Sequence, residues 1–248
     1  MNYRSASKIF FGSVLPAALL LVWSSVFCAE EANKVSSVSR HPLEFRALTD
    51  PAGVLKELPP LIEKATAAKD FRELALLHLA ESNACRVIAD WPCQSSAAAR
   101  ARLAADSARL PELQARGYIL ESRGRMAMQD FSRAGQLLSD AEKILSQNPF
   151  PELSADVYLA YSSLSYTVGK HALAAEYAER GLTALADRPS LLIRVRLLRN
   201  QARAMAQLNN TSGAQAVLQR AIKLVEQVKD PKLTAELHLE DARIARMT

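Results

Sequence analysis

Glycine and aromatic residues are scarce in this chain, whose 248 residues include 8 glycines and 6% Phe, Trp and Tyr. Alanine and leucine supply the hydrophobic residues instead, and arginine and glutamate are abundant. Strands draw on aromatic and β-branched residues, whereas Ala, Leu, Arg and Glu favour helices. The composition therefore argues against a β-sandwich, a β-barrel or a glycine-rich nucleotide-binding fold, and it predicts an all-α protein.

Motifs for catalysis or cofactor binding are also missing. The sequence contains no P-loop, no G-x-G-x-x-G and no G-x-S-x-G. None of the four histidines belongs to an H-E-x-x-H zinc motif, and they are scattered along the chain: His41, His78, His171 and His238. We therefore expect a protein that is not an enzyme and that uses no catalytic residue, metal or cofactor.

The first 29 residues have the features of an export signal. Arg4 and Lys8 are followed by 21 uncharged residues, and no acidic residue lies among them. A basic start before an apolar stretch is typical of a secretory signal peptide. The stretch is also long enough to cross a bilayer, so an uncleaved anchor is an alternative. A lipoprotein signal at Cys28 is a third, with a phenylalanine where a small residue is expected. We predict a periplasmic or envelope-associated protein.

The positive net charge does not indicate nucleic-acid binding. The formal charge is +5, and loss of Arg4 and Lys8 with residues 1–29 leaves 29 basic and 26 acidic residues, or +3. No run of Lys and Arg provides the basic patch that nucleic-acid binding requires. We expect no nucleic-acid partner, and membrane contact only through residues 1–29 if they remain attached.

Two of the 3 cysteines lie outside the export segment, Cys85 and Cys93. An even number of cysteines in an exported chain favours a disulfide. The residues between them are typical of a helix end and a turn, so we predict a disulfide that joins two consecutive helices. Two buried free thiols are the alternative. We expect no zinc site at this pair.

A repeat of forty residues organises the second half of the chain. Polar turns begin at Gln129, Gly169 and Asn209. After each turn come a small, a larger and a small residue: Ala134, Leu138 and Ala141; Ala174, Ala178 and Gly181; Ala214, Leu218 and Ala221. Before each turn lie a core residue and then a small one: Tyr118 and Ser122; Tyr158 and Ser162; Leu198 and Ala202. Small residues at matching positions let helices approach closely, so we expect these residues to be buried.

The residues before this repeat fit less well. Residues 30–50 are polar and aperiodic, and we expect a linker there. We expect helices over residues 51–67, 70–89 and 95–109, the first a short or kinked cap marked by Pro59 and Pro60. Ala101, Ala105 and Ala108 match the second-helix spacing. Residues 70–109 are therefore interpreted as a degenerate repeat whose turn is expanded at residues 90–92.

The pattern resembles the tetratricopeptide repeat (TPR) over residues 114–248. That motif is a pair of antiparallel helices with a bulky residue, a small residue four positions later, a Gly-Asp-Tyr-like turn, and then Ala, an apolar residue and Ala. A period of forty rather than 34 implies longer helices. The resemblance implies a right-handed α-solenoid of about ten helices over residues 51–248. Ala235 and Ala242 continue the register into a first helix that we interpret as a cap or as the front of a longer array.

A second resemblance concerns residues 74–90, which read LALLHLAESNACRVIAD. In an exported, alanine-rich helical repeat, this segment is similar to the N-terminal sensory region of bacterial GGDEF diguanylate cyclases. In those proteins a further membrane helix and a GGDEF domain follow. Neither occurs in this sequence, so cyclase activity is not implied.

In TPR proteins the first helix of each pair lines the concave face. The resemblance therefore places these residues on that face: Arg116, Arg123, Tyr166, Arg196, Arg199, Arg203 and Arg243. Bidentate contacts from arginine suit a carboxylate, so we predict a groove that binds an acidic protein or peptide. A solvated helix face balanced by nearby Asp and Glu is the alternative. The predicted function is a non-enzymatic binding scaffold, and the alternative is the sensory input module of a cyclase-type receptor.

Overall fold

The computed structural model describes residues 40–228 and 230–247. Every regular element in this part is an α-helix, and it contains no strand. The all-α prediction is confirmed, with eleven helices in the described residues where about ten were expected. None of these helices is both long and apolar enough to span a membrane. The predicted export segment, residues 1–29, lies outside the described residues.

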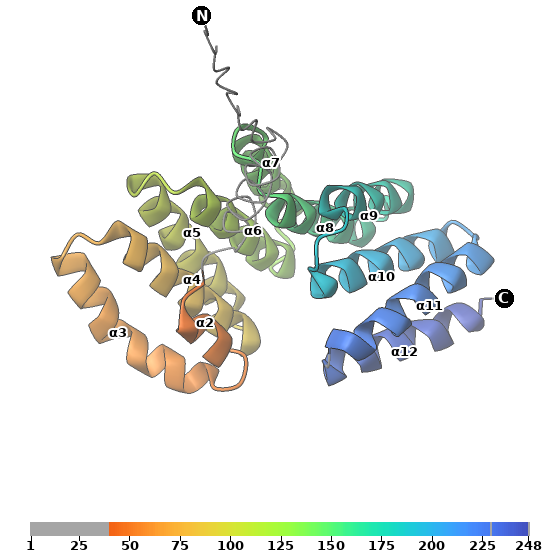
Figure 1. Ribbon diagram of the computed structural model, residues 1–248, viewed down its shortest axis with the longest axis horizontal. Coiled ribbons are helices and arrows are strands. Elements are labelled where there is room, and N and C mark those ends of the chain that lie inside the picture. Colours follow the sequence, from red (N-terminus) through yellow and green to blue (C-terminus); the bar gives the residue numbers. More distant parts are fainter. Residues whose placement is uncertain (1–39, 229, 248) are drawn as a thin grey trace, which may run out of the picture. The chain divides into compact units, whose positions relative to one another are not determined.

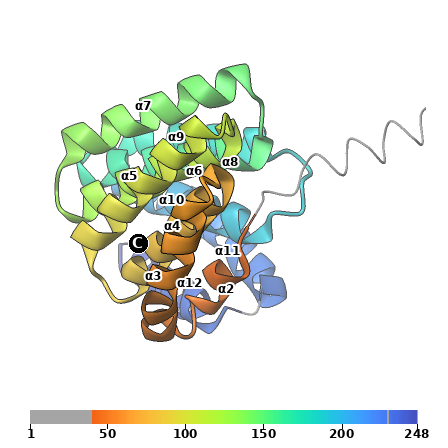
Figure 2. The same ribbon diagram turned by 90° about the vertical axis from the view of Figure 1, so that its left-hand side faces the viewer.

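From Pro51 to Pro231 a helix begins every twenty residues. Consecutive helices pack side by side along the chain (Figure 1; Figure 2). The helices are α2 (Pro42–Arg46), α3 (Pro51–Ala67), α4 (Phe71–Val87), α5 (Trp91–Ser107), α6 (Pro111–Ala127), α7 (Phe131–Gln147), α8 (Pro151–Thr167), α9 (His171–Leu185), α10 (Leu191–Gln207), α11 (Thr211–Val228) and α12 (Pro231–Ala245). This arrangement is that of a helical-repeat solenoid.

The short turns follow one backbone plan, which the turn between α4 and α5 illustrates. Ala89 has a positive φ, and the amide of Asp90 then donates to the carbonyl of Cys85 over 2.9 Å. The Asp90 carboxylate accepts from the amide of Cys93 over 3.0 Å and so caps α5. A residue with positive φ occurs at the same place in the turns at Lys69, Arg109, Gln129, Gly169 and Asn209. An Asp or Asn side chain caps the helix in the same way at Asp50, Asp70, Asp130, Asn210 and Asp230.

These turns predict opposite effects for two exchanges at matching positions. Gln129 and Gly169 have φ of 62° and 77° and lie forty residues apart. A left-handed conformation is costly for a residue with a Cβ and free for glycine. Gln129→Gly should raise the free energy of unfolding by about 0.5–1 kcal/mol, and Gly169→Gln should lower it by about 1 kcal/mol. Urea denaturation measures both, and shifts of the same sign would contradict this description of the turns.

The small residues of the repeat are buried, as predicted. Solvent does not reach Ala134, Ala174, Ala214, Ser122, Ser162 or Ala202. The Ser162 hydroxyl also donates to the carbonyl of Ala174, 2.8 Å away on the next helix. At Gly181 an added Cβ would lie 2.6 Å from Leu197 Cδ2, so the close approach depends on glycine there.

The two tyrosines expected in the core are only half-buried, whereas Leu198, at the equivalent position, is fully buried. The Tyr158 hydroxyl donates to Glu142 over 3.1 Å, and the guanidinium of Arg180 lies over its ring at 4.5 Å from the centroid. Tyr118 is covered by Arg102 in the same manner, at 4.7 Å. The hydroxyl of a tyrosine needs a polar partner, which the edge of the core provides. Leucine has no polar group and can be buried completely.

Residues 51–110 differ from the prediction in register. Helix α5 begins at Trp91 with Pro92 in its first turn, so the turn there is not expanded. The buried residues at the repeat positions are consequently Gln94, Ala98 and Ala101, and Ala108 follows the end of the helix. Helix α3 spans Pro51–Ala67, the range expected, and continues through Pro59 and Pro60, so it is not a short cap. The register of α5 was predicted wrongly because Pro92 was placed in the preceding turn, whereas it lies in the first turn of the helix.

Part of the expected linker is also structured. Helix α2 lies within residues 30–50 and packs on α3 and α4. His41 caps it by accepting from the amide of Leu43, and Leu43 and Glu44 are buried. The polar composition of this segment did not indicate that Leu43 would be buried, or that the Glu44 carboxylate would be buried with hydrogen-bond partners.

Cys85 and Cys93 are joined in a disulfide, with their Cα atoms 5.7 Å apart. The bond connects the end of α4 to the first turn of α5. It restricts the unfolded chain and so stabilises the folded one. It also fixes the last turn of α4, where Arg86 lies.

Candidate functional site

The first helices of the pairs are α4, α6, α8, α10 and α12, and the second helices are α5, α7, α9 and α11. The first helices contact one another as well as the second helices. We call the side of the first helices that bears the predicted arginines the first-helix face. Its residues lie on different helices, so the packing of the pairs brings them together.

Four of the predicted arginines on this face form ion pairs between helices. Arg116 of α6 pairs with Glu44 of α2. Arg123 of α6 pairs with Asp156 of α8 over 2.5 Å. Two arginines of α10 pair with glutamates of α12: Arg199 with Glu236, and Arg203 with Glu240 over 3.4 Å. Much of this surface therefore fits the alternative stated above, a helix face whose arginines are balanced by nearby Asp and Glu.

Burial separates these arginines further. Arg116 is 7% exposed, because α2 covers it, and it is not accessible to a ligand. Arg203 lies over the ring of Tyr166 at 4.2 Å from the centroid, which fixes both predicted residues against each other. Arg243 on α12 is exposed, and it forms no ion pair with any described residue.

Three arginines from three helices lie within electrostatic reach of one another. We call Arg86 of α4, Arg123 of α6 and Arg196 of α10 the arginine cluster; Asp156 of α8 pairs with Arg123 and also attracts Arg196. Within the described residues, Arg86 and Arg196 have no carboxylate within ion-pair distance. Both side chains are half-buried. The cluster therefore holds excess positive charge in a partly dehydrated place.

The pKa values of the cluster reflect this environment. Burial lowers the pKa of Arg196, the charges of Arg123, Arg86 and Arg199 lower it further, and Asp156 opposes them. Burial and the charge of Arg123 lower the pKa of Arg86. Arginine nevertheless remains a cation at neutral pH. In the free protein the positively charged guanidinium groups of the cluster therefore repel one another, and a bound anion would reduce that repulsion.

The sequence prediction did not include Arg86, although its position in the repeat is equivalent to that of a residue that was predicted. It lies eighty residues before Tyr166, at the same place in the forty-residue unit. The incorrect register of residues 70–109 concealed this equivalence. The regular spacing of Asp50, Asp70 and Asp90 was the signal that could have corrected it.

No candidate for a metal site accompanies this face. The described residues contain no group of three His, Cys, Asp or Glu side chains that could hold a metal ion. The first-helix face bears guanidinium groups, aromatic rings and fewer carboxylates than guanidinium groups. Such groups bind anions by charge and hydrogen bonding.

Comparison with known proteins identifies the fold. No protein-family model matches the sequence. No curated protein matches it either. A crystal structure of BtubC (BKLC) from P. vanneervenii is similar, with a TM-score of 0.64 and 16% sequence identity over 84% of each chain. At this identity the similarity concerns the fold alone, and the chain is an α-helical repeat protein.

Proposed function

We propose that this protein is a non-enzymatic, TPR-like scaffold that binds an acidic protein or peptide on its first-helix face. The observation that carries the proposal is the arginine cluster, where Asp156 pairs with Arg123 while Arg86 and Arg196 have no carboxylate within ion-pair distance in the described residues. The other two arginines of the stripe on α10, Arg199 and Arg203, each have a glutamate partner.

The chemistry of the cluster favours carboxylate ligands. Guanidinium groups present parallel N–H donors that match the two oxygens of a carboxylate. Half-burial weakens competition from water, so each contact contributes more than it would on an open surface. Arg123 remains held by Asp156, which leaves Arg86 and Arg196 as the groups we assign to the ligand.

The proposed location is the bacterial periplasm or envelope. The basic and then apolar character of residues 1–29 supports export. The Cys85–Cys93 disulfide supports an oxidising compartment. A partner there would be a protein or peptide rather than a nucleic acid.

A second candidate is a sensory input module of a diguanylate-cyclase-type receptor, truncated or acting in trans. The segment that carries this resemblance, residues 74–90, contains both Arg86 and Cys85. Under this proposal, a ligand at the arginine cluster would alter binding to a separate cyclase. A reading frame for a GGDEF protein directly downstream in the genome would favour it over the simple scaffold.

The test is capture of the partner by crosslinking in the periplasm, followed by mass spectrometry. Arg86→Glu/Arg196→Glu should reduce the captured partner at least about tenfold, since each glutamate repels an acidic ligand. Arg133→Glu/Arg220→Glu changes the charge equally on second helices and should capture as much as the wild type. Equal capture by both double variants would exclude the cluster as the binding site. The same experiment identifies the mature N-terminus.

A further inference from the structure

Two positions of the forty-residue unit lie where one first helix packs on the next. Between α6 and α8 they hold Arg123 and Asp156, which form an ion pair over 2.5 Å. Between α4 and α6, forty residues earlier, they hold Asn83 and Arg116. These two side chains both donate to one carboxylate, that of Glu44 on α2. We call each such pair of positions a step of the first-helix face.

The step between α10 and α12 also contains carboxylates. It holds Arg203 and Glu236. Arg203 pairs with Glu240 over 3.4 Å, and Glu236 pairs with Arg199. Three steps therefore combine arginine with a carboxylate, which comes either from the next first helix or from α2.

The step between α8 and α10 is different. It holds Ser163 and Arg196. These residues follow Asn83 and Arg116 by eighty, which is two whole units. Within the described residues, Arg196 has no carboxylate within ion-pair distance, although Asp156 attracts it. Helices α6 and α12 lie on either side of α8 and α10 in the array, so neither end of the described chain leaves this step open.

The surroundings of Arg196 favour an incoming carboxylate. The charges of Arg86, Arg123 and Arg199 act on it from three helices. Its side chain is half-buried, so part of it reaches solvent, whereas α2 covers the equivalent Arg116 to 7% exposure. A carboxylate at this step would meet several guanidinium groups in a place where water competes weakly.

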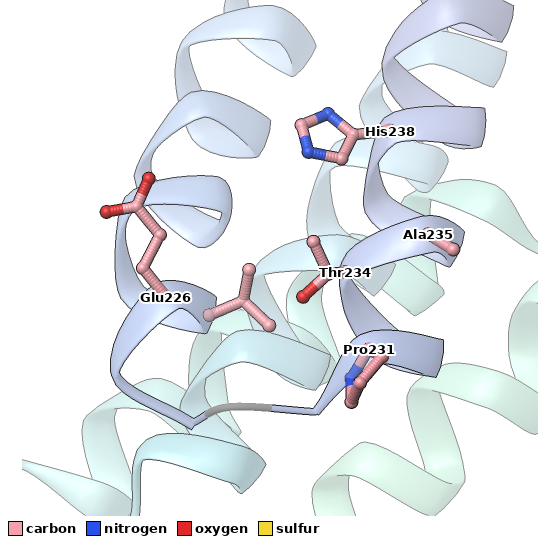
Figure 3. A pocket seen from close by; sticks show the side chains of 6 residues that line it. Glu226, Pro231, Thr234, Ala235 and His238 are labelled. Atoms are coloured by element: carbon pink, nitrogen blue, oxygen red, sulfur yellow. The ribbon is translucent and has the colours of Figure 1, made fainter.

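A hollow of about 540 Å³ between α11 and α12 offers no comparable site. Figure 3 shows Glu226 at one side and Pro231, Thr234 and His238 at the other. Among the described residues, its lining contains neither arginine nor lysine, and Glu226 would repel an acidic ligand. The step between α8 and α10 is therefore the better place for such a ligand.

Helix α2 shows how a carboxylate reaches a step. Glu44 lies in the first turn of this helix, and its carboxylate also accepts from the backbone amide of His41 over 3.2 Å. This is a capping box, in which the first turn of the helix holds the acidic side chain in place. The positive end of the helix further favours a carboxylate there.

We infer that the step between α8 and α10 binds the first turn of a helix of a partner protein, with a capping-box glutamate on Arg196 as Glu44 lies on Arg116. The inference rests on the proposed function and narrows its ligand from an acidic peptide to an acidic helix N-terminus. Arg86 and Arg123 would stabilise the bound charge from α4 and α6.

Two labelled helical peptides test the inference, with the full chain as receptor and fluorescence anisotropy as the readout. The first is a blocked, alanine-based peptide of about 16 residues that begins with the α2 sequence His-Pro-Leu-Glu. The second begins with His-Pro-Leu-Gln and carries its glutamate in the last turn, so the net charges are equal. We expect the first peptide to bind at least about fivefold more tightly, because only its glutamate lies at the helix N-terminus.

Variants of the chain locate the site. Arg196→Met should weaken binding of the first peptide at least about tenfold. Arg220→Met, at an exposed arginine of the second helix α11, is the matched control and should bind like the wild type. Glu30→Gln/Glu31→Gln should also bind like the wild type, because we assign the step to a partner rather than to this chain's own acidic residues. Circular dichroism checks that the variants are folded.

Four results would overturn the inference. The first peptide does not bind, it binds no more tightly than the second, or it binds Arg196→Met as tightly as the wild type. Tighter binding by Glu30→Gln/Glu31→Gln would assign the step to the chain's own N-terminal residues. If polyglutamate binding still depends on Arg196 while the two helical peptides bind equally, the proposed function stands and only this inference fails.

Discussion

Replacing Glu44 with alanine is expected to lower the free energy of unfolding by about 3 kcal/mol. The Glu44 carboxylate accepts from the Arg116 guanidinium, from the Asn83 side chain over 3.4 Å and from the backbone amide of His41 over 3.2 Å. It thereby connects α2, α4 and α6. Glu44 is 5% exposed and Arg116 is 7% exposed, so the substitution leaves a guanidinium buried without this carboxylate. Thermal and urea unfolding measure the loss.

An exposed ion pair that joins α2 to α3 is the control. Arg46 and Glu57 lie 2.6 Å apart, and both side chains are close to half exposed. Glu57→Ala should therefore change stability far less than Glu44→Ala does. If Glu44→Ala were as mild as Glu57→Ala, α2 would not be part of the folded array, contrary to its burial here.

Adding one methyl group at Gly117 is expected to destabilise the protein by about 2 kcal/mol. An ideal Cβ at Gly117 of α6 would lie 2.8 Å from the Cβ of Arg102 and 3.0 Å from its Cα, on α5. Because the contact is with backbone, α5 must move to relieve it. The loss outweighs the gain of roughly 1 kcal/mol that alanine brings to a helix interior.

Gly135 provides the opposite case within the same fold. Its nearest contact for an added Cβ is Leu164 Cδ2 at 3.7 Å, an ordinary separation. Gly135→Ala should raise the free energy of unfolding by about 0.5–1 kcal/mol, because helix propensity acts alone. Equilibrium unfolding of both variants determines the two signs, and stabilisation by Gly117→Ala would contradict the close packing of α5 on α6.

The helices and the core after residue 114 could be predicted because the same residue pattern occurs in several consecutive units. Ala134, Ala174 and Ala214 occupy one position in three units, and a single structural reason explains all three. The first units carry no such redundancy: Gln94 stands where the later units have Ala134, Ala174 and Ala214, and its buried side chain donates to the carbonyl of Leu120 over 3.1 Å. Sequence pattern alone does not reveal a hydrogen bond that makes a polar residue suitable for the core.

The candidate site was predicted in part for a related reason. Helical spacing placed Arg196, Arg199 and Arg203 on one stripe, which agrees with their position on α10. It could not say which of them is neutralised, because Glu236 and Glu240 belong to another helix and reach α10 only in the packed array. Charge balance on such a face depends on contacts between units, and spacing within one helix does not contain them.

The proposed function requires that Arg86 and Arg196 bind acidic ligands. Titration of the wild type and of Arg86→Met/Arg196→Met with a labelled polyglutamate peptide tests this requirement, because methionine retains much of the volume and removes the charge. The variant is predicted to bind at least about tenfold more weakly, or about 1.4 kcal/mol. Its unfolding midpoint without peptide should not fall, since the repulsion among Arg86, Arg123 and Arg196 is removed. Equal affinity of the two proteins for the peptide would contradict the claim.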